Sequence, residues 1–236
     1  MTAELAVLAG GLATRLGERT RTLPKSLIHV AGRPFIAWQL ERFAACGFAR
    51  VVVCTGHLGS QIRAFVKDGS AFGLEVAYAD DGPELLGTGG ALAAALPLMA
   101  ACFVVTYGDS YLPFDYRAPL RALSESPRDE GCLAVLHNQG RWDSSNARVE
   151  GDRVLAYRKN PSDTSFDYID YGALALRRGV LESMTNQRKF GLDWVQSELA
   201  ARGTLRAEHA RERFYEIGSE TGILELEAHL ARRRAH

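Results

Sequence analysis

Residues that can hold phosphate gather near the amino end of the chain. A short apolar run, long enough for one buried strand, leads directly into Gly10 and Gly11. A strand that ends in glycine exposes several backbone N–H groups in a row, and such a nest attracts phosphate oxygens. Thr14 and Arg15 follow, and Lys25 comes ten residues after Arg15. Arg can grip phosphate through two parallel bonds, whereas Lys acts as a mobile charge. The stretch therefore predicts a nucleoside-triphosphate site for nucleotidyl transfer.

The spacing of these glycines excludes two common phosphate-binding loops. Leu12 and Ala13 stand where the dinucleotide pattern G-x-G-x-x-G needs a glycine, and no G-K-[ST] of a Walker A loop follows. Taken alone, the two glycines fit a tight turn after a strand equally well. The whole assembly of L-A-G-G, T-R-L, P-K and V-A-G-R-P is much more specific.

This assembly resembles the signature of the sugar-phosphate nucleotidylyltransferases, which reads roughly L-[AT]-G-G-x-G-T-R-L, then P-K, then P-V-x-G-x-P. Ala13 departs from it, because the family has glycine there and alanine has less backbone freedom. The resemblance covers nearly the whole chain. Within this family, the chain most resembles the heptose 1-phosphate guanylyltransferases and the N-acetylmuramate 1-phosphate uridylyltransferases. It implies catalytic roles for Arg15 and Lys25, and nucleotide binding by Leu8, Ala9, Gly10, Gly11, Thr14, Arg15 and Lys25.

Two acidic residues are candidate magnesium ligands. Asp109 lies in V-V-T-Y-G-D-S, just past a predicted strand, where side chains project into the ligand crevice of an α/β sheet. Magnesium prefers carboxylate and phosphate oxygens and retains waters. The segment resembles the family motif whose Asp binds the metal, so Asp109 is also predicted to be catalytic. Glu216, in F-Y-E-I-G-S, stands where the family has a second metal-binding Asp, and it is one methylene longer.

A second glycine loop, L-G-T-G-G-A-L, precedes an Ala-rich helix. It resembles the family loop that holds the nucleoside, and glycine there lets a flat base or a ribose approach the backbone closely. The alternative is a helix start with flexible glycines. We predict nucleotide contacts from Gly87, Thr88 and Gly89, and from Gly108 at the strand end before Asp109.

The second half of the chain carries the predicted sugar-phosphate contacts. Lys159, in A-Y-R-K-N-P, resembles the family lysine that contacts the sugar phosphate, although Arg158 replaces the usual Glu. The segment of Asp170, Tyr171 and Gly172 resembles an N-A-G segment that holds sugar hydroxyls. Asp in place of Asn turns a donor and acceptor into an acceptor only, which indicates an unusual sugar. Asn146 is a looser match near the sugar.

Composition sets outer limits on function. The 236 residues include 28 basic and 28 acidic side chains, so the formal net charge of zero argues against binding to nucleic acid. No apolar run approaches the roughly 20 residues of a membrane helix, and the first residues do not resemble a signal segment. The four cysteines form no C-x-x-C pair and stand in apolar surroundings, as buried free thiols do. We expect a cytoplasmic protein without membrane or nucleic-acid partners.

The elements that must position these residues alternate through the first half. Strands are predicted at 5–9, 50–55, 74–78 and 103–106, and helices at 35–46, 61–66, 88–98 and 115–124. The second half predicts strands at 133–137, 166–176, 205–207 and 214–217, a hairpin at 149–157, and helices at 180–184, 192–201 and 221–233. Alternation of this kind indicates an α/β fold with a Rossmann-like, doubly wound, mixed but mostly parallel sheet. The family resemblance implies that this fold is of the nucleotidyltransferase type, with a small sugar-side β lobe.

We expect a single domain over 1–236, with a nucleotide-binding half at 1–130 and a sugar-binding half at 131–236. The implied reaction joins an NTP and a sugar 1-phosphate into an NDP-sugar and pyrophosphate, with Mg²⁺ as cofactor. Two alternatives stay open: a cytidylyltransferase acting on a phosphorylated amino-alcohol, and a nucleotide-binding regulatory module without catalysis. The base, the sugar and the choice between monomer and homodimer are not given by the sequence.

Overall fold

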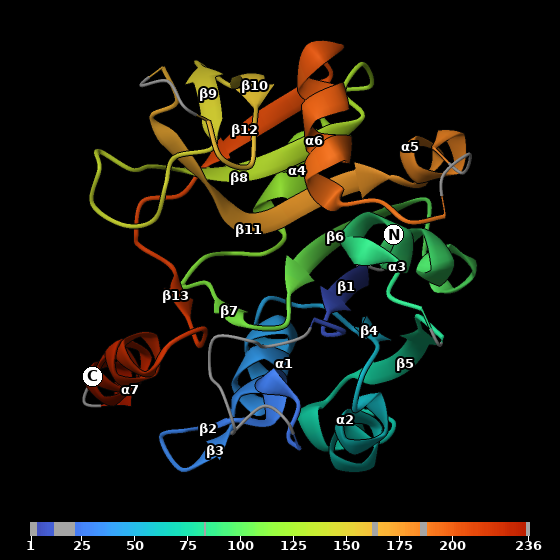
Figure 1. Ribbon diagram of the computed structural model, residues 1–236, viewed down its shortest axis with the longest axis vertical. Coiled ribbons are helices and arrows are strands. Elements are labelled where there is room, and N and C mark those ends of the chain that lie inside the picture. The colour runs from blue at the N-terminus through green and yellow to red at the C-terminus, as the bar shows by residue number, and fades with distance from the viewer. Residues whose placement is uncertain (1–3, 12–21, 83, 162–164, 185–187, 235–236) are drawn as a thin grey trace.

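A nine-stranded sheet runs through both halves of the chain (Figure 1). The computed structural model describes residues 4–11, 22–82, 84–161, 165–184 and 188–234. The strand order is β5-β4-β1-β6-β11-β8-β12-β10-β9. Thr14, Arg15 and Ala13 lie outside the described residues, so their predicted roles stay predictions.

The first four strands of this order are parallel. They are β5 (Glu75–Asp80), β4 (Arg50–Thr55), β1 (Glu4–Leu8) and β6 (Cys102–Tyr107). Both faces of β4 are covered, and five of its six residues are buried, as the apolar V-V-V-C run requires. Because the strands are parallel, their carboxyl ends meet at one edge of the sheet. The glycine turn after β1 and the Gly-Asp pair after β6 therefore lie at the same edge.

The other five strands make the sheet mixed. The long β11 (Tyr168–Arg177) pairs antiparallel with β6 and with β8 (Gly131–His137), and β12 (Leu205–His209) runs parallel to β8. The predicted hairpin is present as β9 (Ala147–Glu150) and β10 (Arg153–Tyr157). These strands continue the same sheet into the second half of the chain. The predicted α/β fold is thus confirmed.

Helices cover both faces of the sheet. Two large apolar clusters result, one built on α1 (Phe35–Ala45), α2 (Gly59–Val66) and α4 (Ala118–Ser124), and the other on α3 (Gly87–Ala95), α5 (Arg178–Ser183) and α6 (Leu192–Ala201). The helix predicted from Asp115 begins only at Ala118, after a turn in which Ala118 N–H donates to the Asp115 carbonyl. Short 3₁₀ turns η2 (Lys25–Leu27), η3 (Ser70–Phe72) and η4 (Leu96–Leu98) link the elements.

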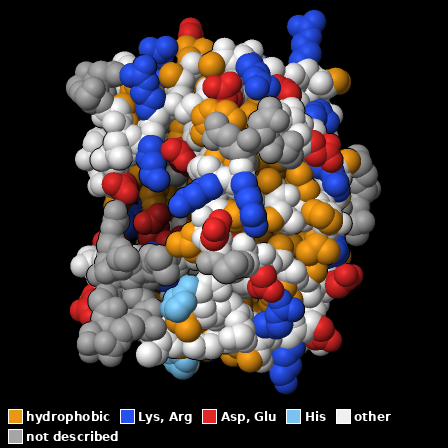
Figure 2. All heavy atoms as spheres, turned by 45° about the vertical axis from the view of Figure 1, so that its right-hand side comes forward, with side chains coloured by type: hydrophobic (Ala, Val, Ile, Leu, Met, Phe, Trp, Pro, Cys, Tyr) orange, Lys and Arg blue, Asp and Glu red, His pale blue; other side chains and the backbone are white. Residues whose placement is uncertain are grey.

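A third apolar cluster lies beside the main sheet. It joins α7 (Glu220–Arg234) to the small strand β2 (His29–Val30) and to a ribbon of β7 (Ser110–Tyr111) and β13 (Tyr215–Glu216). The strand β3 (Arg33–Pro34) pairs with β2. The strand predicted at 214–217 is therefore shorter and pairs with β7 instead of joining the main sheet. Basic and acidic side chains are interspersed over the face shown in Figure 2. Among the described residues, no helix is long and apolar enough to cross a membrane.

Candidate active site

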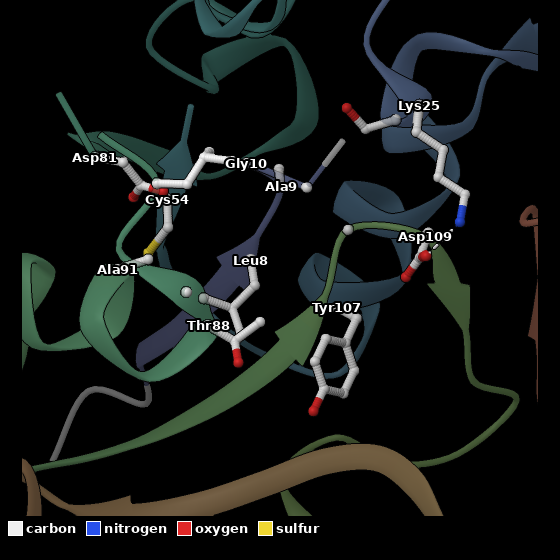
Figure 3. A pocket seen from close by; sticks show the side chains of 15 residues that line it. Leu8, Ala9, Gly10, Lys25, Cys54, Asp81, Thr88, Ala91, Tyr107 and Asp109 are labelled. Carbon is white, nitrogen blue, oxygen red and sulfur yellow. Dashed lines mark hydrogen bonds and ion pairs between the residues drawn. The ribbon is translucent and has the colours of Figure 1, made fainter. Parts of the chain in front are cut away.

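A cavity of about 330 Å³ opens at the carboxyl ends of β1, β4, β5 and β6 (Figure 3). This is the edge at which doubly wound sheets bind ligands. The residues that line it are Leu8, Ala9, Gly10, Gly11, Lys25, Ser26, Cys54, Asp81, Leu85, Gly87, Thr88, Ala91, Tyr107, Gly108 and Asp109. Nine of these fifteen are predicted site residues. The site residues Gly89, Asn146, Lys159, Asp170, Tyr171, Gly172 and Glu216 do not line it.

The glycines at the floor of the cavity allow the backbones of neighbouring strand ends to come close together. Gly108 N–H donates to the Leu8 carbonyl at 2.9 Å, and a Cβ on Gly108 would lie 3.0 Å from the Ala9 Cα. A Cβ on Gly10 would lie 3.1 Å from the backbone nitrogen of Gly56, which follows β4. Side chains at these positions would push the strand ends apart. Glycine thus keeps the backbone of three neighbouring strands close together at the cavity.

Lys25 and Asp109 face each other at the mouth of the cavity. The Lys25 Nζ lies 2.5 Å from Asp109 Oδ2, with the two side chains 20% and 34% exposed. Lys25 is fixed because it begins η2, whose next two residues, Ser26 and Leu27, are buried. A Cβ on Gly218 would lie 3.2 Å from the Nζ, so the F-Y-E-I-G-S segment also borders this amine. The predicted lysine and aspartate are brought together as an ion pair.

The β7–β13 ribbon brings Glu216 beside Asp109. Glu216 pairs in register with Ser110, and Ile217 N–H donates to the Asp109 carbonyl at 3.0 Å. The Glu216 side chain is exposed. Two carboxylates 107 positions apart in the chain are therefore carried by neighbouring backbone positions.

Negative charge is concentrated around Tyr107. Burial raises the pKa of this phenol well above its ordinary value, and the charges of Asp170, Asp109, Asp193 and Glu216 raise it further. Lys25, which is ion-paired with Asp109, places a positive charge near these carboxylates. In the described part of the chain, no three His, Cys, Asp or Glu side chains form a metal cluster. Mg²⁺ nevertheless needs only one or two carboxylates together with substrate phosphates, and Asp109 and Glu216 fit that need.

The glycines of the L-G-T-G-G loop lie close to the segment before α6. A Cβ on Gly87 would lie 2.5 Å from the Phe190 carbonyl oxygen, and a Cβ on Gly89 would lie 2.4 Å from the Phe190 ring. A Cβ on Gly90 would lie 2.6 Å from the Arg188 carbonyl oxygen. These glycines make room for the segment before α6, and nucleotide contacts from Gly87 and Gly89 stay a prediction. Gly87 still lines the cavity, whereas Gly89 does not.

Thr88 joins the two halves of the site. Its hydroxyl oxygen accepts a hydrogen bond of 2.8 Å from the backbone N–H of Leu192, at the start of α6. Thr88 also lines the cavity (Figure 3). Contact with a nucleotide would therefore be coupled to the position of α6, which packs over the sugar-side strands.

Asp170 is the centre of a hydrogen-bonded group in the second half of the chain. Its carboxylate accepts from the Gln196 amide at 2.7 Å, the Tyr157 hydroxyl at 3.1 Å and the Gly172 N–H at 2.9 Å. Asn146 accepts from the Asp170 N–H at 2.7 Å. Burial raises the pKa of Asp170, and the three donors partly counteract this. Three protein donors leave the carboxylate little free capacity, so it first of all fixes the irregular turn at Gly172, where φ is +94°.

The remaining predicted sugar-side residues lie apart. Tyr171 is 1% exposed, and its ring packs edge-on against Phe114 and Phe214, within the core on the opposite face of β11. Its side chain is thus a core side chain, and only its backbone remains for a substrate. Lys159 is exposed and lies two residues beyond Tyr157, the donor to Asp170. Substrate binding by these residues stays a prediction.

Asp81 and Tyr107 are cavity residues that sequence reasoning missed. Asp81 directly follows β5 and Tyr107 ends β6, so both stand at carboxyl ends of parallel strands. The rule that ligands bind at this edge could have found Asp81. It did not, because the predicted strand ended at Tyr78, two residues before β5 does.

A parallel sheet edge with a glycine turn, a cavity, a lysine and carboxylates is typical of α/β proteins that bind nucleotide phosphates. Residues 5–190 match the MobA-like NTP transferase domain, and the chain belongs to that family. It is 38% identical over 122 residues to an N-acetylmuramate alpha-1-phosphate uridylyltransferase of Neisseria meningitidis, covering 51% of this chain and 53% of the relative. It is 26% identical over 214 residues to a D-glycero-alpha-D-manno-heptose 1-phosphate guanylyltransferase of Campylobacter jejuni, covering 90% and 93%.

The resemblance to sugar-phosphate nucleotidylyltransferases is therefore confirmed. The chain spans about half the length of several of the curated relatives it matches. Other relatives are named glucose-1-phosphate thymidylyltransferases, so the names of the relatives differ in the base transferred. The structure of HddC from Yersinia pseudotuberculosis has the same fold, with a TM-score of 0.80 at 20% identity over 97% of this chain and 99% of that one.

Proposed function

We propose that the chain transfers a nucleotidyl group from an NTP to a sugar 1-phosphate, giving an NDP-sugar and pyrophosphate, for polysaccharide or cell-wall precursor synthesis. The observation that carries this proposal is the Lys25–Asp109 pair, 2.5 Å apart at the mouth of a cavity floored by the glycine turn. Relatives named for uridylyl, guanylyl and thymidylyl transfer to sugar 1-phosphates support it.

The attacking group needs no general base. A sugar phosphate is already an anion near neutral pH, because its second pKa is about 6. The barrier comes from bringing this anion onto the α-phosphate of the NTP. Lys25 offsets charge on the α-phosphate and on the departing pyrophosphate. Arg15 is assigned the same task from the sequence, and Lys159 is assigned the positioning of the attacking phosphate in line.

Mg²⁺ is the proposed cofactor, held by Asp109 and Glu216. These two carboxylates supply oxygen ligands, and the substrate phosphates supply the rest. When bound, the ion would neutralise charge on the transferring and leaving phosphates. Asp109 also orients Lys25 through their ion pair.

The sugar side is formed by β11 and its neighbours. Asp170 fixes the turn at Gly172, whose N–H donates to Asp170 and whose carbonyl accepts from the Thr106 hydroxyl, so the Tyr171 backbone is the proposed partner of sugar hydroxyls. Asn146 supports the same turn by accepting from the Asp170 N–H. Asp170 thus acts by shaping the sugar site as well as through any remaining acceptor capacity.

The test is pyrophosphate release with Mg²⁺ across the common NTPs, each paired with a panel of sugar 1-phosphates. The panel includes mannose, glucose, heptose, N-acetylglucosamine and N-acetylmuramic acid, with phosphocholine as an amino-alcohol control. Release with one sugar 1-phosphate supports the proposal and names both substrates. Release with phosphocholine alone would identify a cytidylyltransferase. NTP binding without release in either direction, including the reverse reaction from pyrophosphate and NDP-sugars, would identify a regulatory module.

A further inference from the structure

The buried face of α1 carries a glutamine among apolar side chains. Gln39 is 0% exposed, and the other buried positions of this helix carry Phe, Ile, Ala or Leu side chains. An amide inside an apolar cluster costs free energy unless its hydrogen bonds are made. A glutamine at this position therefore indicates a polar partner that an apolar side chain could not serve.

The partner of Gln39 is the turn between β6 and β7. The Gln39 Nε2 donates to the Tyr107 carbonyl and to the Ser110 carbonyl, both at 2.8 Å. Both partners are acceptors, so the amide nitrogen with its two hydrogens is the atom that faces them. The Oε1 atom has no hydrogen-bond partner in the described part of the chain, so the amide is kept for its donor. The two carbonyls flank Gly108 and Asp109.

Backbone hydrogen bonds hold the same turn from two other elements. Gly108 N–H donates to the Leu8 carbonyl at the end of β1, and Ile217 N–H, just after β13, donates to the Asp109 carbonyl. The Asp109 side chain is left to face Lys25, as Figure 3 shows. Gln39 does not line the cavity, so it reaches the Asp109 carboxylate through the backbone of the turn.

We propose that Gln39 is a positioning residue for Asp109. By fixing the carbonyls on both sides of Asp109, it holds the carboxylate where it meets Lys25 and, in the proposed reaction, the metal. The metal part of this inference rests on the proposed function. Residues that orient a metal ligand from behind commonly change metal affinity or activity by about 10- to 100-fold when they are replaced.

The first test needs neither metal nor turnover. Gln39→Met nearly keeps the volume of the side chain and removes both donors. Amide hydrogen exchange at Gly108 and Ile217 is expected to accelerate by about 10- to 100-fold relative to the amides of β12, as the loss of two hydrogen bonds implies. Unchanged exchange at these two amides would overturn the proposal.

The matched control is Arg42→Met, on the same helix. Arg42 lies three positions after Gln39 and donates to the Phe114 carbonyl at 2.9 Å, four positions beyond Ser110. Its replacement removes a donor from α1 to the same segment without touching the turn of Asp109. Exchange at Gly108 is therefore expected to stay unchanged in Arg42→Met. If Gln39→Met does not fold, Gln39→Asn withdraws the amide by one methylene and is expected to accelerate the same exchange.

The second test asks whether Gln39 acts through Asp109. In pyrophosphate release, Gln39→Met is expected to raise the Mg²⁺ concentration for half-maximal rate by about 10- to 100-fold, and Arg42→Met is expected to leave it unchanged. In an Asp109→Asn background, Gln39→Met is expected to add no further loss, because residues that act as a unit are not additive. Losses that multiply, or an unchanged Mg²⁺ dependence, would overturn the positioning role.

The two tests separate this inference from the proposed function. If the unmodified protein releases no pyrophosphate with any pair of substrates, the reaction is rejected, and hydrogen exchange still decides whether Gln39 holds the turn. If Gln39→Met releases pyrophosphate normally and its exchange is unchanged, the positioning role is overturned and the reaction stands.

Discussion

Replacing Lys25 with alanine tests whether this lysine is a catalytic cation or only one half of a structural ion pair. The Lys25–Asp109 pair is partly exposed, at 20% and 34% of the two side chains. Pairs of this kind contribute about 1 kcal/mol or less to the free energy of unfolding. A group that stabilises charge in the transition state contributes more, about 10² to 10³ in rate, or roughly 2.7–4 kcal/mol. Lys25→Ala is therefore expected to lose turnover by about that factor while the fold survives.

The assay is the initial rate of pyrophosphate release at saturating NTP and sugar 1-phosphate, with unfolding followed by urea denaturation. The control is Arg33→Ala, which breaks a surface ion pair with Glu41 whose side chains are 38% and 46% exposed. This control is expected to leave both turnover and stability nearly unchanged. Turnover of Lys25→Ala close to that of the unmodified protein would assign Lys25 to structure alone. A matching loss in Arg33→Ala would show that the effect is not specific.

Three further changes give distinct outcomes. Gly89→Ala is expected to destabilise the fold by about 1–3 kcal/mol in urea, because its Cβ would lie 2.4 Å from the Phe190 ring; Gly179→Ala, with nothing within 4 Å, is expected to cost nothing. Asp81→Asn is expected to stabilise the nucleotide-free protein near neutral pH, since the raised pKa of Asp81 means that the folded state binds the proton more tightly than the unfolded state. This gain should shrink as pH falls through the raised pKa toward about 3.9, and a gain that grows instead would contradict the sign. Arg15→Ala is expected to cut pyrophosphate release by about 10² to 10³, with circular dichroism unchanged; near-normal release would exclude a catalytic role.

The residues at the ends of the parallel strands could be predicted because each belongs to a short sequence pattern. The glycine turn and Gly108 each follow an apolar run, and parallel strand ends share one edge. Lys25 could be placed through its spacing from that turn. The structure brings these residues to one cavity. Asp81 was missed only because the end of a strand cannot be fixed to within two residues when polar residues follow it.

The reason for the L-G-T-G-G glycines could not be found in the sequence. Their Cβ positions are filled by Arg188 and Phe190, about one hundred positions later in the chain. A glycine indicates that something approaches closely, but it does not say whether the neighbour is a ligand or the chain itself. The sequence therefore could not show that the chain itself approaches this loop, and nucleotide contacts from Gly87, Thr88 and Gly89 stay a prediction.

Of the features discussed, the juxtaposition of Asp109 and Glu216 joins the most distant parts of the sequence. Asp109 and Glu216 are joined through the β7–β13 ribbon, in which each strand has only two residues. Such short strands have no periodicity that could give their register, and α7 holds the ribbon in place through the third apolar cluster. Glu216 lies opposite Ser110 instead of Asp109. The Glu216 side chain is exposed and lines a second pocket, beside Arg213 and Gly218, instead of the cavity that Asp109 lines. A metal shared by Asp109 and Glu216 therefore stays a prediction.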